Sequence, residues 1–215
     1  MKRQLGLSLI ELMIAILISS LLLLGVLQLF SNTSASDRTN TALARVQESG
    51  RIALEIIGTD ARRAGYQGCG SAAETTTVGS LTFPEAAIAT ATSSITFRYA
   101  TGVDTGTAFA FKTACSGGAL YLNTITYNSC PNNGVARLCK TVNGATATPI
   151  LDNANITAIS FGIPSGGTFK WKDNTSITTA ELAEAHAVRV TLTVSDARNE
   201  ISRSFTGTYE LRNRL

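Results

Sequence analysis

Residues 6–36 of this chain read GLSLIELMIAILISSLLLLGVLQLFSNTSAS, and this stretch decides the fold class. Between residues 7 and 30, 18 of 24 positions are apolar, and the 25 residues 12–36 carry no charge. A helix rises about 1.5 Å per residue and needs about 20 apolar residues to cross the core of a bilayer. We therefore predict a transmembrane helix at residues 7–30.

The charges before this stretch predict its orientation. Lys2 and Arg3 directly precede the apolar run, and basic residues stay on the cytoplasmic side of a membrane. The formal net charge of the chain is +3, of which these two residues contribute +2. Since no basic run follows downstream, we expect no nucleic-acid partner. The N-terminus is expected in the cytoplasm, and the rest of the chain outside it.

Glu11 is an acidic residue near the start of the apolar run. A carboxylate inside a membrane costs roughly 2.5–3.5 kcal/mol on insertion scales and is a functional candidate. Two simpler readings compete, a cleaved secretory signal peptide and a permanent anchor. A signal peptide has a shorter apolar core, of about 7–15 residues, and a plain anchor has no use for a carboxylate.

The order of these features resembles a known signal. A short basic leader, the segment Gly6-Leu7-Ser8-Leu9-Ile10-Glu11 and an unbroken apolar helix resemble the class III signal of type IV pilins and pseudopilins. The resemblance implies that residues 1–6 are a leader peptide, that a dedicated peptidase cuts after Gly6, and that it methylates Leu7. It also implies that Glu11 pairs with the N-terminal amine of a neighbouring subunit, which offsets the cost of burying the carboxylate.

The helix is expected to continue beyond the membrane as an amphipathic segment, residues 31–65. Neither a proline nor a glycine cluster separates the two parts, and Gly65 supplies a C-terminal stop. Small and apolar residues recur at spacings of three and four, as on one face of a helix. They are Leu43, Val46, Gly50, Ala53, Ile57, Ala61 and Ala64.

Residues 66–215 are expected to form one extracytoplasmic, β-rich head. Alternating apolar positions predict several short strands, and Thr178 with Glu181 matches a helix capping box. The fold class is therefore α+β, a long N-terminal helix packed on a mainly antiparallel sheet, as in type IV pilins. The expected strands include residues 95–99, 109–112, 120–127, 135–142, 159–163, 188–194 and 202–211.

Four cysteines, Cys69, Cys115, Cys130 and Cys139, lie on the predicted outer side of the membrane. An even number of cysteines in an oxidising compartment indicates disulfides. Of three possible connectivities we favour Cys69–Cys115 with Cys130–Cys139. A zinc site is the alternative, but the chain has no C-x-x-C pair and a single histidine, so no metal ligand is assigned.

A second resemblance covers the end of the long helix and the end of the chain. Residues 51–54 (RIAL), 60–69 (DARRAGYQGC) and 209–214 (YELRNR) are similar to the PilW group of minor pilins. The middle of the head carries no such match. Taken as local structure alone, residues 60–69 are a helix stop followed by half of a disulfide, with Asp60 and Arg63 as a solvated pair.

The chain shows no pattern typical of an enzyme. His186 is the single histidine, and the sequence contains no G-x-S-x-G, Walker or H-E-x-x-H motif. Residues 152–155 carry Asp and Asn but lack the spacing of a calcium loop, so a turn between strands is the favoured reading. Phe169 and Trp171 fit an alternating edge strand or a contact at the tip of a filament. We assign no catalytic residue and no cofactor.

The resemblances imply a minor pilin that helps to prime assembly of a type IV pilus. The implied partners are other minor pilins, the major pilin, the inner-membrane assembly platform and the prepilin peptidase. The expected location is the inner membrane, with the head in the periplasm, and afterwards the pilus. The alternatives are a pseudopilin of a type II secretion system and, from other classes, a ligand-binding tip adhesin or a membrane-anchored hydrolase.

Overall fold

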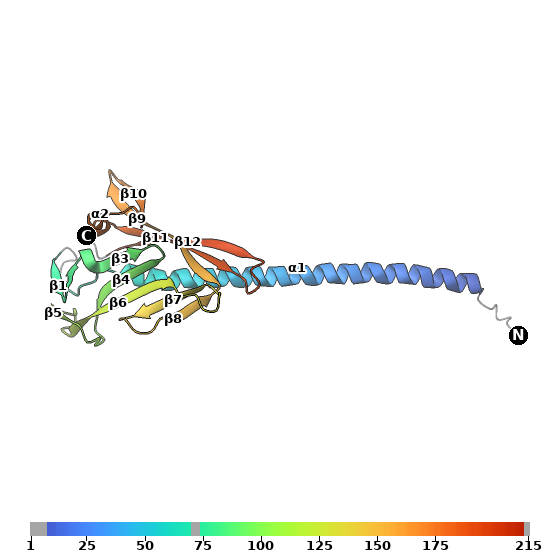
Figure 1. Cartoon of the computed structure of the whole chain (residues 1–215), viewed down its shortest axis with the longest axis horizontal. Helices are drawn as coiled ribbons and strands as arrows, with labels where there is room; N and C mark the ends of the chain where they lie inside the picture. Colours follow the sequence, from blue (N-terminus) through green and yellow to red (C-terminus); the bar gives the residue numbers. More distant parts are fainter. Residues whose placement is uncertain (1–7, 70–73, 213–215) are drawn as a thin grey trace. The chain divides into compact units, whose positions relative to one another are not determined.

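The computed structural model describes residues 8–69 and 74–212. The chain divides into two compact units, Met1–Ala44 and Arg45–Leu215, and we describe each by itself. The helix α1 (Leu9–Arg63) supplies the described part of the first unit and enters the second (Figure 1). A long helix packed on antiparallel sheets confirms the predicted α+β class.

Helix α1 has 55 residues and contains no proline. It ends close to the predicted position, because Gly65 adopts a positive φ of 82°, a conformation that continues no helix. The Gly65 N–H donates to the carbonyl of Arg98 at 2.9 Å. The chain therefore leaves the helix by bonding directly to a strand of the head.

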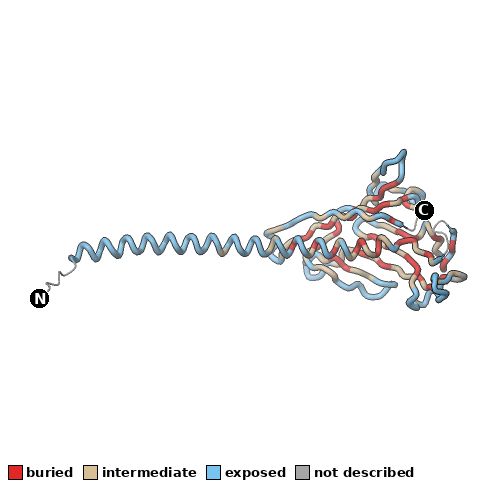
Figure 2. The backbone as a smooth tube through the Cα atoms, turned by 180° about the vertical axis from the view of Figure 1, so that it is seen from behind, coloured by how far each residue is buried: buried red, intermediate tan, exposed pale blue. Residues whose placement is uncertain are grey.

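Within the second unit, one face of α1 is buried against the sheets (Figure 2). Gly50 lies against the ring of Phe205, and Gly58 lies against the ring of Tyr209. A Cβ atom at either glycine would overlap these rings, so both positions permit a close approach of helix and strand. The predicted apolar face is confirmed, since Val46, Gly50, Ala53, Ile57, Ala61 and Ala64 are buried and Leu43 is partly buried.

A substitution at Gly58 tests this close approach. We expect Gly58→Ala to lower the free energy of unfolding of the head by about 1–3 kcal/mol, because the added methyl group displaces the Tyr209 ring. The matched control is Gly25→Ala, where an added Cβ meets nothing within 4 Å. Urea unfolding followed by circular dichroism measures both. Equal effects of the two substitutions would contradict the close packing of Gly58 against Tyr209.

Two antiparallel sheets make up most of the head. The sequence predicted one mainly antiparallel sheet, because alternation alone does not show which strands share a sheet. The six-stranded sheet has the order β3-β4-β6-β7-β8, with β5 also paired to β6. Its strands are β3 (Ile88–Ala91), β4 (Ser94–Thr101), β5 (Ala108–Thr113), β6 (Ala119–Ser129), β7 (Arg137–Val142) and β8 (Thr148–Asp152).

The four-stranded sheet has the order β10-β9-β11-β12. Its strands are β9 (Ala154–Ser165), β10 (Thr168–Asp173), β11 (Ala187–Ser195) and β12 (Ser202–Glu210). A separate hairpin joins β1 (Thr76–Val78) to β2 (Leu81–Phe83), and a short 3-10 helix, η1, spans Glu85–Ala87. The short helix α2 (Thr179–Ala183) starts at the predicted capping box, in which Thr178 and Glu181 each accept the other's backbone N–H.

The main core of the head lies where α1 meets both sheets. Ile57 of α1, Tyr127 of β6, Leu138 of β7 and Val190 of β11 are fully buried members of one apolar cluster. A smaller cluster joins the β1–β2 hairpin to β5 and β6 around Phe83. Because the main cluster contains residues of α1 and of both sheets, its burial fixes the second part of the helix in the head.

Candidate functional site

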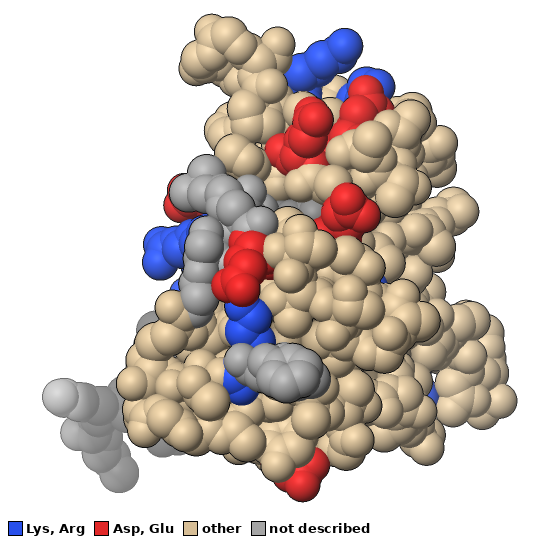
Figure 3. Space-filling view, turned by 90° about the vertical axis from the view of Figure 1, so that its left-hand side faces the viewer, with Lys and Arg blue, Asp and Glu red and all other residues tan. Residues whose placement is uncertain are grey.

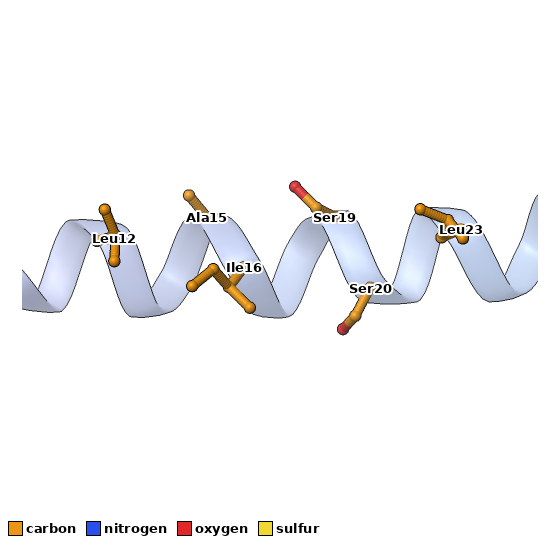
Figure 4. A pocket seen from close by; sticks show the side chains of 6 residues that line it. All are labelled: Leu12, Ala15, Ile16, Ser19, Ser20 and Leu23. Atoms are coloured by element: carbon orange, nitrogen blue, oxygen red, sulfur yellow. The ribbon is translucent and has the colours of Figure 1, made fainter.

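The first part of α1 is an apolar surface without a partner in the described chain. Its sixteen large apolar side chains from Leu9 to Phe30 are each more than half exposed. The helix has a stretch of mean hydropathy 2.6, of which none is buried, so its length and composition suffice to cross a membrane. Figure 4 shows one side of this surface, where Leu12, Ile16 and Leu23 lie beside Ala15, Ser19 and Ser20.

Glu11 is the acidic residue in the first turn of α1, and its side chain is exposed. In the part of the chain that the structure describes, no lysine or arginine pairs with its carboxylate. The predicted processing residues Gly6 and Leu7 lie outside the described residues. Glu11 is therefore an exposed carboxylate on a helix that is long and apolar enough to cross a membrane.

Two other polar side chains in the apolar part of α1, those of Ser20 and Gln28, form hydrogen bonds within the helix. The hydroxyl of Ser20 donates to the carbonyl of Leu17 at 2.8 Å, and the amide of Gln28 donates to Asn32 at 3.2 Å. Such local hydrogen bonds lower the cost of placing these side chains in lipid. Glu11 differs from them, because a carboxylate has no donor hydrogen and accepts from no other described side chain.

The second part of α1 carries a buried carboxylate, Asp60, whose side chain is only 6% exposed. Its Oδ1 accepts from the hydroxyl of Tyr99 at 3.0 Å, and its Oδ2 accepts from the hydroxyl of Tyr127 at 2.5 Å. The ammonium of Lys140 lies 2.8 Å from Oδ2. These partners come from β4, β6 and β7, so one carboxylate ties the helix to three strands of the six-stranded sheet.

The reading of Asp60 and Arg63 as a solvated pair is wrong. Asp60 lies on the buried face of α1 and pairs with Lys140, while the guanidinium of Arg63 lies 5.9 Å from the centre of the Tyr99 ring. The sequence did carry a signal, because Asp60 directly precedes Ala61 and follows Ile57 by three residues. A carboxylate at that position on a helix lies next to the apolar face. No pattern in the sequence identified the residues that Asp60 contacts.

A third tyrosine attaches α1 to the four-stranded sheet. The hydroxyl of Tyr209, in β12, donates to the carbonyl of Leu54 at 2.6 Å. The guanidinium of Arg62 lies 6.0 Å from the centre of the Tyr209 ring, and Arg62 forms an ion pair with Glu55 at 2.9 Å. Together with the Gly58 contact, this bond ties the helix to the last strand of the chain.

These contacts shift the tyrosine pKa values upward. Burial, then the hydrogen bond to Asp60, raises the pKa of Tyr127 far above its ordinary 10.0, and burial raises that of Tyr99. Burial, then the negative charge of Glu55, raises the pKa of Tyr209 to about 12. All three hydroxyls are therefore neutral at physiological pH and act as hydrogen-bond donors.

The raised pKa values predict a loss of stability in alkali. Folded Tyr209 keeps its proton between pH 10 and about 12, where a tyrosine of the unfolded chain ionises, so unfolding releases a proton; the raised pKa values of Tyr99 and Tyr127 act in the same direction. The stability that these tyrosines contribute is fully present below pH 10 and is lost as the pH rises. Urea unfolding at a series of pH values measures the loss. Tyr209→Phe is expected to reduce the slope between pH 10 and 12, and an unchanged slope would contradict the assignment.

The cysteines form two disulfides, Cys69–Cys115 and Cys130–Cys139, which is the connectivity favoured on the sequence. The first links the segment after α1 to the turn after β5, across 46 residues, and the second links the end of β6 to β7. Their Cα atoms are 5.1 Å and 5.9 Å apart, within the usual range for disulfides. Both crosslinks lie in the six-stranded half of the head.

The remaining candidates take part in the fold. The backbone of His186 bonds to Gly162 and to Leu211 as β11 begins. Asn153, with a φ of 53°, forms the predicted turn between β8 and β9. Among the described residues, no group of three or more His, Cys, Asp and Glu could hold a metal ion. On the face of the head in Figure 3, the described acidic and basic side chains are interspersed.

Phe169 and Trp171 lie in β10, which is an edge strand, as one of the two readings expected. Their ring centres are 6.2 Å apart, and the guanidinium of Arg189 lies 3.9 Å from the centre of the Trp171 ring. Arg189 thus covers one face of the indole, in a cation–π contact. Lys172, also in β10, forms an ion pair with Glu181 of α2.

Comparisons with known families point in one direction. A family model described as prepilin peptidase-dependent protein B matches residues 39–211, which is most of the chain. A second model, the prokaryotic N-terminal methylation motif, matches residues 1–27. No curated protein and no solved structure matches the chain significantly. The first match covers the head with the second part of α1, and the second match covers the apolar helix with Glu11.

Proposed function

Because the chain belongs to the family of prepilin peptidase-dependent protein B, and is thus type IV pilin-like, we propose that it is a minor pilin that primes pilus assembly. The observation that carries the proposal is the exposed apolar part of α1. This surface anchors the chain in a membrane and, in a filament, packs against the helices of other subunits. The head then acts as a rigid body, since Asp60 and Tyr209 tie α1 to both sheets.

In this proposal, the prepilin peptidase removes residues 1–6 by cutting after Gly6 and methylates Leu7. Glu11 then becomes the fifth residue of the mature chain and pairs with the N-terminal amine of a neighbouring subunit. The N-terminus begins in the cytoplasm, and the head lies in the periplasm before it enters the pilus. The partners are other minor pilins, the major pilin and the assembly platform of the inner membrane.

Families of this kind are typically structural, and we propose no enzymatic activity for the head. The contacts of the head support a structural role. The Asp60 cluster, which consists of Asp60, Tyr99, Tyr127 and Lys140, holds elements of the fold together, as do Tyr209 and the disulfides. In the described residues, the single histidine contributes backbone hydrogen bonds to β-sheet pairing.

Mass spectrometry of the mature chain tests the proposed processing. We expect cells that contain the prepilin peptidase to yield a chain that starts at a methylated Leu7. Cells that lack the peptidase are expected to retain residues 1–6. The matched variant is Gly6→Val, whose branched side chain at the cleavage site is expected to block cutting. A mature N-terminus between residues 31 and 37 would instead identify an ordinary signal peptide and overturn the proposed function.

A further inference from the structure

The long edge strand β12 differs from the other sheet edges of the head. It has nine residues and pairs with β11 along its whole length without a register shift. No described strand pairs with its other side. Its charged residues, Arg203 and Glu210, lie near its two ends. It carries no lysine and no proline, the residues that commonly protect an edge from further pairing.

Three other edge strands, β8, β10 and β3, carry such protection. Strand β8 contains Pro149 and a register shift against β7, and strand β10 contains Lys170 and Lys172. Strand β3 has four residues, and the amide of Asn174 donates to the carbonyl of its last residue, Ala91, at 2.6 Å. The edge of β12 is therefore more open to a further strand than these three edges.

The pairing register shows which backbone groups β12 presents. In an antiparallel ladder, alternate residues direct both N–H and C=O to the same neighbour. The N–H of Leu211 donates to His186, and the N–H of Asp196 donates to Ile201, so odd-numbered positions of β12 face β11. The even-numbered positions therefore direct their N–H and C=O groups away from the sheet. They are Ser202, Ser204, Thr206, Thr208 and Glu210, and all five side chains are exposed.

The side chains beside this edge define what could be added to it. On the outer face of the sheet, β12 and β11 pair hydroxyls, as in Thr206 with Thr191 at 3.0 Å and Ser204 with Thr193 at 3.3 Å. On the inner face, the rings of Phe205 and Tyr209 are only partly buried against α1. An added strand with polar residues on one face and apolar residues on the other would match both the outer hydroxyls and the inner rings.

A second copy of this chain fits the edge poorly. Phe205 contacts Gly50 and Tyr209 contacts Gly58, so β12 runs parallel to the second part of α1. In a symmetric pair, in which the free β12 edges of two copies meet across a two-fold axis normal to the sheet, the two strands are antiparallel. Such a pair places the two Arg45 ends, where α1 enters each head, at opposite ends of the joint sheet. Chains anchored in one membrane disfavour this arrangement.

We propose that β12 accepts an extended strand from a different subunit of the filament, which adds to the four-stranded sheet as a fifth strand. The inference rests on the proposed function and names the kind of contact by which the head joins its partner. Backbone hydrogen bonds from the even-numbered residues provide affinity. The hydroxyl row and the partly buried rings of Phe205 and Tyr209 select a strand of alternating polar and apolar residues.

Amide hydrogen exchange at single-residue resolution tests this proposal. The full-length chain is compared in detergent and in assembled filaments. We expect the N–H groups of Ser204, Thr206 and Thr208 to exchange at least about tenfold more slowly in filaments. The N–H groups of Phe205 and Gly207 face β11, are protected in both states, and serve as the control within the same strand.

A pair of variants makes the test independent of folding. Thr206→Pro removes one outward N–H and leaves the ladder to β11 intact, since proline is tolerated where the N–H faces solvent. Thr206→Val keeps the N–H. We expect the proline variant to enter filaments at least about tenfold less often than the valine variant, with the Phe205 amide equally protected in both.

The outcomes separate the two proposals. A wild-type chain that never enters filaments overturns the proposed function and this inference with it. A chain that enters filaments while the amides of Ser204, Thr206 and Thr208 still exchange rapidly overturns the inference alone. Equal incorporation of the proline and valine variants also overturns it. Protection in filaments built from this chain alone would identify a second copy as the added strand, and would overturn the assignment to a different subunit.

Discussion

Replacement of Asp60 by alanine is expected to lower the free energy of unfolding of the head by about 3–5 kcal/mol, because it breaks a buried ion pair from one side. The variant leaves the hydroxyls of Tyr99 and Tyr127 and the ammonium of Lys140 without their shared acceptor. The side chain of Lys140 is 26% exposed, so water relieves part of its loss, and the lower end of this range is expected. Urea unfolding at neutral pH measures the change.

The matched control lies one and a half turns earlier on the same helix. Glu55 also forms an ion pair, with Arg62 at 2.9 Å, but its side chain is 69% exposed. Exposed pairs contribute about 0–1 kcal/mol, so Glu55→Ala is expected to have a small effect. Asp60→Asn keeps one acceptor oxygen for the hydroxyls and is expected to fall between the two. Equal effects of Asp60→Ala and Glu55→Ala would contradict the role of Asp60 as a buried tie.

The contacts of Asp60 could not be predicted from the sequence, although its neighbours on the buried face of α1 could. Spacing along α1 was enough to predict its buried face, because i, i+3 and i+4 positions recur in the sequence itself. The partners of Asp60 lie 39, 67 and 80 residues away in the chain. Contacts at that separation depend on which strands become neighbours, and a single sequence carries no pattern for that. A charged residue among apolar positions was therefore read as exposed.

The lack of a sequence pattern for distant contacts also explains why the division of the strands into two sheets was not predicted. Alternation predicted β6, β11 and β12 with ends close to those observed, and the Thr178 capping box predicted α2, because each signal lies within a few residues. The alternation of apolar and polar residues does not show which strands pair with each other. The division into a six-stranded and a four-stranded sheet was therefore not predicted. The shared core explains how both sheets are held, since α1 contributes Ile57 and Ala61 to the cluster that joins them.

Of the candidate site, most features of the N-terminal helix could be predicted from the sequence, but few features of the head could. A carboxylate within an apolar run is conspicuous in any sequence, so Glu11 could be named without a structure. The open edge of β12 could not, because an edge strand and a central strand of the same composition look alike. Only the pairing register reveals that five of its residues direct their backbone groups outward.

Glu11→Ala is expected to abolish incorporation of the chain into filaments while leaving it in the membrane. Removal of the carboxylate lowers the cost of inserting α1 by roughly 2.5–3.5 kcal/mol, so the amount of chain in the membrane stays the same or rises. The proposed partner, the N-terminal amine of a neighbour, loses the anion that offsets its own burial. Breaking such a pair in an apolar medium costs about 3–5 kcal/mol, enough to reduce association by two orders of magnitude or more.

Two controls separate the charge of Glu11 from its size and from the fold of the head. Glu11→Gln keeps the shape and one acceptor oxygen but removes the charge, and we expect it to be nearly as defective as alanine. Glu48→Ala removes a carboxylate that is paired with Arg51 on the exposed side of α1, and it is expected to assemble normally. Quantitative immunoblots of membrane and sheared-filament fractions report both steps. Normal incorporation of Glu11→Ala would mean that the apolar surface of α1 alone recruits the chain, because no other described residue of that surface carries a charge before Asp37.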